Sequence, residues 1–572
     1  MTPVRISILV LIALGVSLAE FYFQLGYAYA IGYTSLPFDW DNNRYVDTAW
    51  LYLNAIRDHG LQGLLQIYAD KPPYSFTLLL TGLPFLALSG QEHSLFTSQL
   101  IYVLLMDAGL LFSIWRLTGS LSWAAFGLLT FTSWTSGIVS GVNLNAAMES
   151  VKYQLNVPLG ALYIALTWMI LEALPTSRKK IWGTGLTLIL TLGLLLRPPM
   201  LPFFLLSFFP LLALVSVFAW RQGIHSIAAW TAFAIGSSSI VTATHYANIW
   251  PKLLVYVNRA VSSEHGAAMF STEKTGLDYI GFYLNTAIDQ SPAVIILLAA
   301  MLLTIPHSFF IIKNSFYQSP LESRQNQEAI KWVIVWWLLM VTYAVPTVAK
   351  TKNPFFGLPF MLVAWVGGTY AIHTIISMIQ AAIKPRHITI LYGIVTGLAT
   401  ITVSVYLLNS KRDIKWTWEY SHYKEEKYLK RLHGHQLSKA IHQRITRLIY
   451  DWATANHLQE VSVGIDDRRQ GAYAHPDKHN LRIGLARLSQ GTIRLYSSAT
   501  PKLGIEIECD PRAPSVRRAL GMPLDRYWPE RAAGKYHGGD YTEIHRSKIC
   551  NACILALYES KNNGFRNSYE WP

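Results

Sequence analysis

Charged residues are scarce in this sequence. Asp, Glu, Lys and Arg make up 14% of its 572 residues, whereas 52% are hydrophobic; a soluble globular protein is about one quarter charged. Long apolar runs recur from residue 6 to residue 408 and then stop, and the mean hydropathy is +0.26. This composition excludes an ordinary soluble protein and predicts a polytopic membrane protein with a soluble tail.

Cysteine is rarer still. The three cysteines, Cys509, Cys550 and Cys553, all lie in the tail. If the tail faces an oxidising compartment, we expect one disulfide among them. No second Cys-x-x-Cys accompanies the Cys550/Cys553 pair, so a zinc site is not expected. The tail also lacks a glycine-rich phosphate loop and the residue order of a catalytic triad, so it predicts no chemistry of its own.

Acidic residues are outnumbered, which leaves a net charge of +14 at pH 7. Much of the Lys and Arg sits in short loops between apolar runs or in the tail beyond Lys411. Basic loops of this kind are retained in the cytoplasm and attract anionic lipid headgroups. We therefore expect membrane lipids, and no nucleic acid, as partners of this charge.

About eleven segments approach the ~20 residues that cross a bilayer. They are 6–27, 97–117, 120–138, 155–174, 182–197, 200–220, 225–246, 291–312, 330–349, 355–380 and 386–408. Segment 74–90 is interrupted by Gly82 and Pro84, so we interpret it as a re-entrant or interfacial element. The predicted fold is a mainly α-helical polytopic membrane domain, 1–409, followed by a soluble α/β domain, 410–572.

The tail begins with a basic helical stretch, 424–456. Short strand-like runs follow it at 461–465, 481–486, 492–498 and 503–509. We interpret the tail as a module that positions an acceptor, or as a lid that stabilises the fold.

Loop charge predicts the orientation. With the N-terminus cytoplasmic, every second turn carries Lys or Arg: Arg116, 177–180, 221–223, 312–331 and 383–387. The longer loops 28–96, 139–154 and 247–290 then lie outside together with the tail. We therefore predict a multi-pass inner-membrane protein whose functional surface and C-terminal domain are extracytoplasmic.

A polar cluster opens the first of these outside loops. Asp39 and Asp41 stand two residues apart and are followed by Asn42, Asn43 and Arg44. Residues 42–58 carry Val46, Ala49, Trp50, Leu53 and Ile56 at helical spacing, which predicts a helix along the membrane surface. One alternative is that Asp41 only caps this helix; the other is that the cluster holds a cation or deprotonates an acceptor.

A second polar motif, YADKPPYSF, occupies residues 68–76 of the same loop. Its two prolines stiffen the chain, and Asp70 and Lys71 present both signs of charge at the interface. A lysine ammonium is a compact point charge suited to a phosphate.

Taken in order, DNNRYVDTAWLYL and DKPPYSFTLLL resemble the first extracytoplasmic loop of the GT-C glycosyltransferases. The resemblance is to the branch with the aminoarabinose transferase of lipid A and the protein O-mannosyltransferases. Looser similarity follows in LNVPLGALYIAL (155–166), LLLRPPMLPF (195–204) and KTKNPFFGLPFML (350–362). The likeness in layout covers residues 1–408, its specific motifs lie in the first loop, and the tail is outside it.

The resemblance implies transfer of a sugar from a polyprenyl-phosphate donor to a glycan, lipid or protein acceptor at the periplasmic face. Asp41 matches the catalytic base, Arg44 and Tyr45 match the residues after it, and Lys71 matches the lysine that meets the donor phosphate. A divalent metal ion is the cofactor that some relatives use. Its ligands here would be Asp70 with Glu92 or His93.

Topology adds further candidates for the substrate site. Arg197, Lys350 and Lys352 fall on the outer side, where they suit the leaving phosphate; the alternative for each is a cation that snorkels to the interface. Glu149 falls there too and could join the acid cluster. The sequence departs from the family at Asn42 and Asn156, where aspartate or glutamate is usual, and Asp39 is placed to compensate.

Two other functions stay open. A transporter or flippase of a lipid-linked saccharide would show broken helices with polar residues at the midplane. A catalytically inactive GT-C relative would explain Asn42 and Asn156. Within the predicted spans, Asp107 is either functional or paired across helices, and His245 is interpreted as an ordinary loop residue.

Overall fold

The computed structural model describes most of the membrane part and the core of the tail. The described residues are 3–30, 40–73, 75–90, 93–135, 155–173, 179–221, 223–262, 280–291, 293–317, 324–348, 354–382, 444–467, 493–496, 501–509, 540–550 and 553–561. Five predicted site residues lie outside them, namely Asp39, Glu92, Glu149, Lys350 and Lys352, as does the predicted span 386–408.

The chain divides into two compact units. The first comprises Met1–Gln24, Pro72–Leu80 and Ser98–Thr417, and the second comprises Leu25–Lys71, Thr81–Thr97 and Trp418–Pro572.

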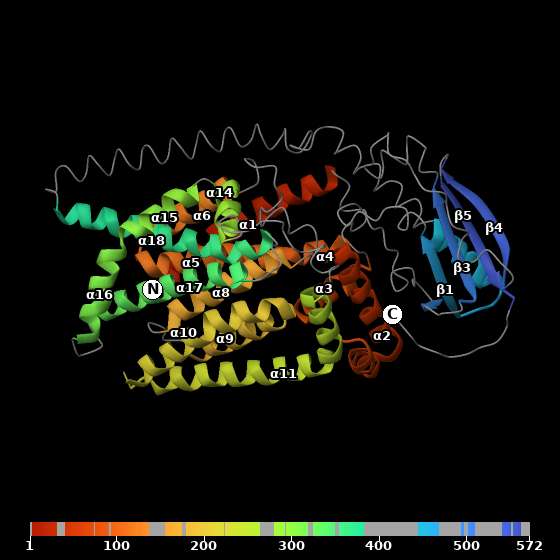
Figure 1. Cartoon of the computed structure of the whole chain (residues 1–572), viewed down its shortest axis with the longest axis horizontal. Helices are drawn as coiled ribbons and strands as arrows, with labels where there is room; N and C mark the ends of the chain where they lie inside the picture. Colours follow the sequence, from red (N-terminus) through yellow and green to blue (C-terminus); the bar gives the residue numbers. More distant parts are fainter. Residues whose placement is uncertain are drawn as a thin grey trace. The chain divides into compact units, whose positions relative to one another are not determined.

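The first unit is a bundle of helices (Figure 1). Its main members are α1 (Pro3–Ala30), α5 (Gln99–Thr118), α6 (Leu121–Thr135), α8 (Asn156–Ala173), α9 (Lys179–Leu194), α10 (Leu201–Arg221), α11 (His225–Ser262), α14 (Phe282–Gln290), α15 (Ala293–Leu303), α16 (Ile305–Tyr317), α17 (Arg324–Val348) and α18 (Leu358–Ala382). Two short 3₁₀ helices, Pro198–Met200 and Pro354–Gly357, precede α10 and α18. Every predicted span except 386–408 therefore coincides with one or two helices.

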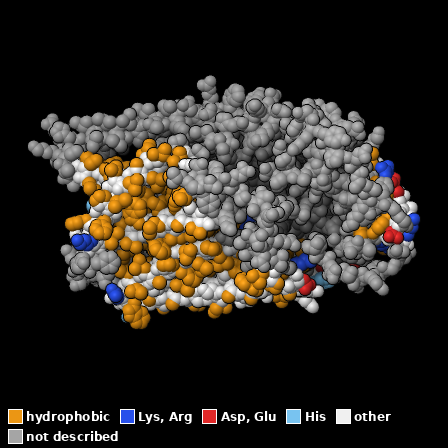
Figure 2. All heavy atoms as spheres, viewed as in Figure 1, with side chains coloured by type: hydrophobic (Ala, Val, Ile, Leu, Met, Phe, Trp, Pro, Cys, Tyr) orange, Lys and Arg blue, Asp and Glu red, His pale blue; other side chains and the backbone are white. Residues whose placement is uncertain are grey.

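Five of these helices are long and apolar enough to cross a membrane, considering the described residues alone: Gln99–Thr118, Leu201–Arg221, His225–Pro251, Asn326–Val348 and Leu358–Gln380. The pair Phe282–Ile288 and Ala293–Leu303 would add a sixth if it forms one bent span. Hydrophobic side chains cover much of the described surface of this unit that Figure 2 shows. Leu206, Phe233 and Ile240 are each more than half exposed. An exposed apolar belt of this kind suits lipid as its solvent and supports a multi-pass membrane protein.

The core of the bundle is the pair α5 and α8, which run in the same direction. Gly109 of α5 faces Ile164 and Ala165 of α8 so closely that an added Cβ would lie 2.8 Å from the Ile164 side chain and 3.0 Å from the Ala165 nitrogen. Small residues permit this backbone approach between helices in a membrane. Because α6 returns between them, α5 and α8 begin at one end of the bundle and finish at the other.

Some polar groups inside the bundle are paired across helices. Ser17 of α1 donates to Asp107 Oδ2 of α5 at 2.6 Å, and both side chains are fully buried. Trp365 Nε1 of α18 donates to the Gly127 carbonyl of α6 at 3.0 Å. This favours the second alternative for Asp107, an acid that pairs across helices.

In the second unit, the tail forms a five-stranded mixed sheet of order β2-β1-β3-β5-β4 (Figure 1). Its strands are β1 (Glu460–Asp467), β2 (Arg494–Tyr496), β3 (Leu503–Cys509), β4 (Tyr541–Cys550) and β5 (Cys553–Ser560). The pairs β1/β2 and β1/β3 are parallel, whereas β3/β5 and β4/β5 are antiparallel. A helix at 444–455 covers one face and buries Ile445, Ile449 and Ala453 against strand residues such as Val461 and Leu557.

Candidate functional site

The first-loop motif forms the start of helix α2 (Trp40–Asp70), in the second unit. Because α2 begins at Trp40, Asp41 lies within its first turn rather than before it, so the predicted N-cap position is shifted. The backbone N–H groups of a first helical turn favour a negative charge there. Arg44 follows one turn later, and the side chains of residues 41–44 lie outside the described ones.

The predicted apolar face of α2 is confirmed, but protein covers it instead of lipid. Val46, Ala49, Trp50 and Leu53 are at most 3% exposed, and Ile56 is half-buried. Tyr45, predicted to follow the base into the substrate site, is 6% exposed and belongs to this buried stripe. The rigid packing of this face fixes the first turn, and so the backbone of Asp41.

Helix α2 bends at Gly60, whose φ of 58° is left-handed and suits glycine. Beyond the bend, Leu61 and Leu65 are 71% and 62% exposed and lie one turn apart. The second half of α2 therefore carries apolar side chains on its exposed side.

The buried face of α2 also anchors Lys71. Tyr52 is fully buried and its hydroxyl donates to the Lys71 carbonyl at 3.0 Å, while the Lys71 N–H donates to the Ile67 carbonyl at 2.8 Å. Burial, and then the neighbouring Tyr68, raise the pKa of Tyr52 above its usual range, so the hydroxyl stays a donor at physiological pH. The lysine main chain is thus tied to the helix that begins with Asp41.

In the first unit, the segment after Lys71 docks on helix α9 through a hydroxyl. Ser75 accepts a hydrogen bond from the Leu78 N–H at 3.3 Å, which caps helix α3 (Phe76–Ser89). The predicted re-entrant element 74–90 is therefore helical across Pro84. Thr77 then donates to the Leu192 carbonyl of α9 at 2.6 Å, and Tyr102 of α5 donates to the Thr77 carbonyl at 3.4 Å.

A second hydroxyl closes the same end of α9. Tyr246 of α11 donates to the Leu194 carbonyl at 2.8 Å, and its neighbour His245 lies with its ring 5.8 Å from that of Phe76. The last carbonyls of a helix have no partner inside it, so such donors satisfy them. His245 is 3% exposed and helical, which corrects its interpretation as a loop residue.

Arg197 lies three residues beyond Leu194. Its backbone is extended, with φ −168° and ψ 144°, and Pro198 and Pro199 start the 3₁₀ turn that follows. Gly193 is required nearby, because a Cβ there would lie 2.5 Å from the Phe204 ring. Two hydroxyl caps, a proline turn and this close contact constrain the backbone that leads into the half-buried Arg197.

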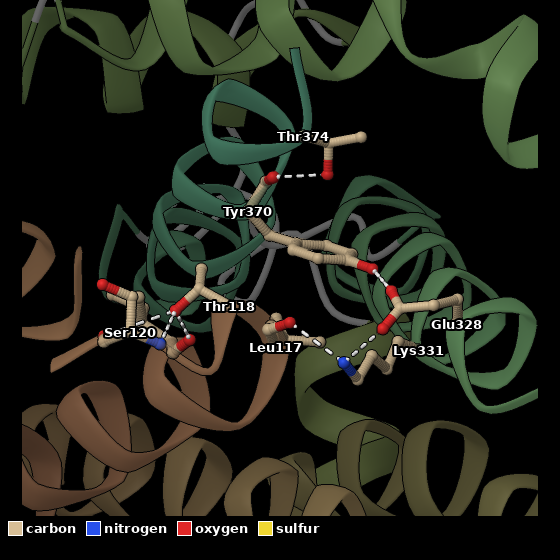
Figure 3. Close-up of polar contacts among 8 residues, drawn as sticks. Leu117, Thr118, Ser120, Glu328, Lys331, Tyr370 and Thr374 are labelled. Carbon is tan, nitrogen blue, oxygen red and sulfur yellow. Dashed lines mark hydrogen bonds and ion pairs between the residues drawn. The ribbon is translucent and has the colours of Figure 1, made fainter. Parts of the chain in front are cut away.

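The opposite end of the bundle carries the charged pairs. Arg116 of α5 pairs with Glu172 of α8, and Arg116 also lies over the Trp115 ring at 4.6 Å. Lys331 of α17 donates to the Leu117 carbonyl at 3.0 Å and to Glu328 at 2.7 Å, and Tyr370 of α18 donates to the other oxygen of Glu328. Figure 3 shows Glu328 between Tyr370 and Lys331, with Lys331 reaching the end of α5.

The remaining predicted ligands are not brought together in the described residues. Asp70 is exposed at the end of α2, and His93 starts helix α4 (His93–Thr97) with its side chain outside the described ones. Across the described residues no group of three His, Cys, Asp or Glu could hold a metal ion. The metal set therefore stays a prediction.

Sequence reasoning missed the hydroxyl groups that hold the site. Thr77 and Tyr246 fall in apolar helical stretches and Tyr52 falls inside a predicted amphipathic helix, where hydroxyls are common. Nothing local distinguishes them, because their acceptors lie 115, 52 and 19 positions away. A partial signal was available for Thr77, since it follows the proline pair that the motif already marks.

Comparison with known proteins gives structural similarity alone. No protein-family model and no curated protein sequence matches the chain. Its fold is similar to that of ArnT from Cupriavidus metallidurans bound to undecaprenyl phosphate, with 11% identity and a TM-score of 0.46 over 97% of this chain and 98% of that one. The ArnT structure in the apo state has 10% identity to this chain and a TM-score of 0.45, over 93% of this chain and 97% of that one.

An archaeal oligosaccharyltransferase, AglB from Archaeoglobus fulgidus, is also similar. Its structure holds an inhibitory peptide and a dolichol-phosphate; the identity is 12% and the TM-score 0.35, over 69% of this chain and 56% of that one. Each of these is a similarity of fold at low sequence identity. The roles assigned to residues rest on the chain's own sequence and geometry.

Proposed function

We propose that this protein is an integral-membrane glycosyltransferase of the GT-C type. It transfers a sugar from a polyprenyl-phosphate-linked donor to a glycan, lipid or protein acceptor at the extracytoplasmic face of the inner membrane. The N-terminus is cytoplasmic, and the domain 410–572 stands on the same side as the first loop. Asp41 is the general base, and Lys71 and Arg197 are the cations that meet the donor phosphate.

One observation carries the proposal: the two motifs of the first loop lie at the two ends of α2, which is bent at Gly60 and buried in its first half. Asp41 lies in the first turn of α2, and Lys71 follows its last residue and is bonded to Tyr52 in its middle. A base and a phosphate-binding cation must keep fixed positions to act on one substrate. A cap for a helix would require neither the second motif nor the internal anchor.

The Arg197 turn supplies independent support. Four constraints converge on it, from Thr77, Tyr246, Gly193 and the proline pair, although an arginine that only snorkels needs none of them. A preorganised charge near a departing group stabilises the transition state more than a flexible charge does, because it does not have to reorganise during the reaction.

The proposed reaction is an in-line displacement at the anomeric carbon. The acceptor oxygen forms the new bond to that carbon as Asp41 takes its proton, and the bond from the carbon to the phosphate oxygen breaks with its electron pair. The polyprenyl phosphate leaves with one more negative charge on its oxygen. Lys71 and Arg197 stabilise that charge, and Asp39 and Arg44 support the base; no step is routed through a metal ion.

A transporter of lipid-linked saccharide is the second candidate, favoured by the 118° bend between the two helices at 282–303. Against it, the described acid at mid-bundle, Asp107, is bonded to Ser17. A catalytically inactive relative is the third. Both predict that Asp41 has no role in transfer.

Asp41→Asn tests the proposal, because asparagine keeps the shape but cannot take a proton. We expect transfer in membranes to fall by about 10²- to 10⁴-fold, with binding of the lipid-linked donor retained. Asp58→Asn, an exposed acid of the same helix, is the matched control and should leave transfer unchanged.

Sugar transfer that survives Asp41→Asn would remove the proposed base. Movement of the lipid-linked saccharide across vesicles by the wild-type protein, without transfer to any acceptor, would favour the transporter. Equal losses in Asp41→Asn and Asp58→Asn would indicate damage to α2 instead of lost chemistry.

A further inference from the structure

The three cysteines of the tail meet at one register position of the sheet. Cys509 ends β3, Cys553 starts β5 and Cys550 ends β4. Cys553 is the pairing partner of Cys509 across β3/β5 and of Cys550 across β4/β5. Since β5 lies between β3 and β4, Cys553 stands in the middle of a row of three cysteines.

Sheet geometry decides which of the three can bond. Directly opposed residues of antiparallel strands have Cα atoms about 4.5–5.5 Å apart, within the roughly 4.4–6.8 Å that a disulfide spans. Cys509 and Cys550 are separated by the whole of β5, so their Cα atoms are about 9–10 Å apart. Two pairings are therefore open, both of them use Cys553, and the third is excluded.

We infer that Cys553 is the shared member of an exchangeable disulfide, bonded either to Cys509 or to Cys550. Formation is a two-electron oxidation: two thiols lose two protons and two electrons to a disulfide-bearing oxidant, which is reduced to two thiols. Exchange needs no further oxidant. The thiolate of the third cysteine attacks the Cys553 sulfur, a new S–S bond forms, and the displaced cysteine leaves as a thiolate.

The two states differ in what they tie together. The Cys550–Cys553 bond closes a hairpin with two intervening residues, Asn551 and Ala552, and so adds little to a contact that is already local. The Cys509–Cys553 bond joins strands separated by a long stretch of sequence, and a disulfide that closes a longer loop stabilises a fold more. Exchange from Cys509–Cys553 to Cys550–Cys553 therefore replaces a cross-link between β3 and β5 with one between β5 and the edge strand β4.

Disulfide mapping of the full-length protein in detergent tests the inference. The protein is oxidised with oxidised glutathione, its free thiols are alkylated, and peptides are identified by mass spectrometry without reduction. We expect one free thiol per chain and linked peptides that always contain Cys553. Cys509→Ser should yield the Cys550–Cys553 bond, and Cys550→Ser the Cys509–Cys553 bond with the higher melting temperature of the two.

Cys553→Ser is the decisive variant, because it retains two thiols that the sheet holds apart. It should keep both free after the same oxidation, while its reduced form melts close to the reduced wild type, which controls for folding. A Cys509–Cys550 bond in any folded sample, or three free thiols in oxidised wild type, would overturn the inference. The sugar-transfer assignment does not depend on this result, and each can fail alone.

Discussion

The two ends of the helix α5 show two different uses of polar chemistry. Tyr102, near its start, bonds the Thr77 carbonyl, and Thr77 bonds the end of α9 from which Arg197 projects. Arg116 is 14 positions further along, about 21 Å away at 1.5 Å per residue, and is paired with Glu172. Charged groups bond one another at the Arg116 end, whereas at the other end the bonds described run from hydroxyls to main-chain carbonyls.

This difference is what we expect if the Arg116 end is an anchor and the Arg197 end belongs to the proposed substrate site. At the Arg116 end, Glu172 and Glu328 are matched by Arg116 and Lys331, so the charges neutralise each other and fix α5, α8, α17 and α18 together. At the Arg197 end, the hydroxyls of Thr77 and Tyr246 bond main-chain carbonyls of α9, and we propose that the arginine there meets an anionic ligand. The role proposed for a basic residue at a helix end therefore depends on the groups around it, which are acids at Arg116 and hydroxyls at the Arg197 turn.

The largest expected effect comes from comparing two single variants, each of which removes the arginine at one end of the bundle. Arg197→Ala should lower sugar transfer by about 10²-fold or more, because a preorganised charge beside the leaving phosphate is lost, with a small change in melting temperature. Arg116→Ala should do the reverse: it leaves Glu172 without its cation and destabilises the protein by about 1–2 kcal/mol, with transfer per folded molecule unchanged. Transfer assays and melting curves in the same detergent measure both.

Rescue sharpens the first result. Arg197→Lys keeps the charge but loses the fork geometry, so it should recover part of the activity. If Arg116→Ala and Arg197→Ala reduce transfer to the same extent at matched folded fractions, the distinction between the two ends fails.

Lys331→Met should produce the next largest effect. The methionine keeps the apolar stem but leaves the Leu117 carbonyl and Glu328 without their donor, so we expect a loss of about 1–3 kcal/mol. Tyr370→Phe alone should cost less, and the double variant should cost less than the sum because both side chains bond Glu328. Denaturant-induced unfolding followed by tryptophan fluorescence measures the three; strict additivity would show that the cluster is not coupled.

The helices were predictable because their signal is local. Apolar runs of bilayer length marked most helices of the bundle, but α14 and the last part of α11 lie in the predicted loop 247–290. The 3.6-residue spacing of Val46, Ala49 and Leu53 marked the buried stripe of α2. What covers that stripe was not predictable, since lipid and protein select the same residues. The strands β4 and β5 were missed in a tail whose apolar pattern is interrupted by charged residues such as Glu543 and Arg546.

The candidate site was predictable only where residues are consecutive. Asp41 and Lys71 were marked by their motifs, and Arg197 by its charge at a helix end before two prolines. The donors at the end of α9 before Arg197, Thr77 and Tyr246, depend on contacts between distant helices, which one sequence does not display. The three cysteines show the same limit: their number predicted one disulfide, but the choice of partner depends on strand order.

The smallest expected effect tests whether hydroxyls really hold the arginine end. Thr77→Val removes the donor to the Leu192 carbonyl while keeping the side-chain volume, so we expect about 1 kcal/mol of lost stability and a several-fold rise in KM for the lipid-linked donor. Thr184→Val is the control. Thr184 is exposed on α9, the helix that carries Leu192, and its hydroxyl bonds within α9, to the Lys180 carbonyl at 3.0 Å. Thr77→Ser should restore the KM for the lipid-linked donor, since serine keeps the hydroxyl donor. If Thr77→Val lowers stability without changing this KM, the hydrogen bond stabilises the fold but does not position Arg197.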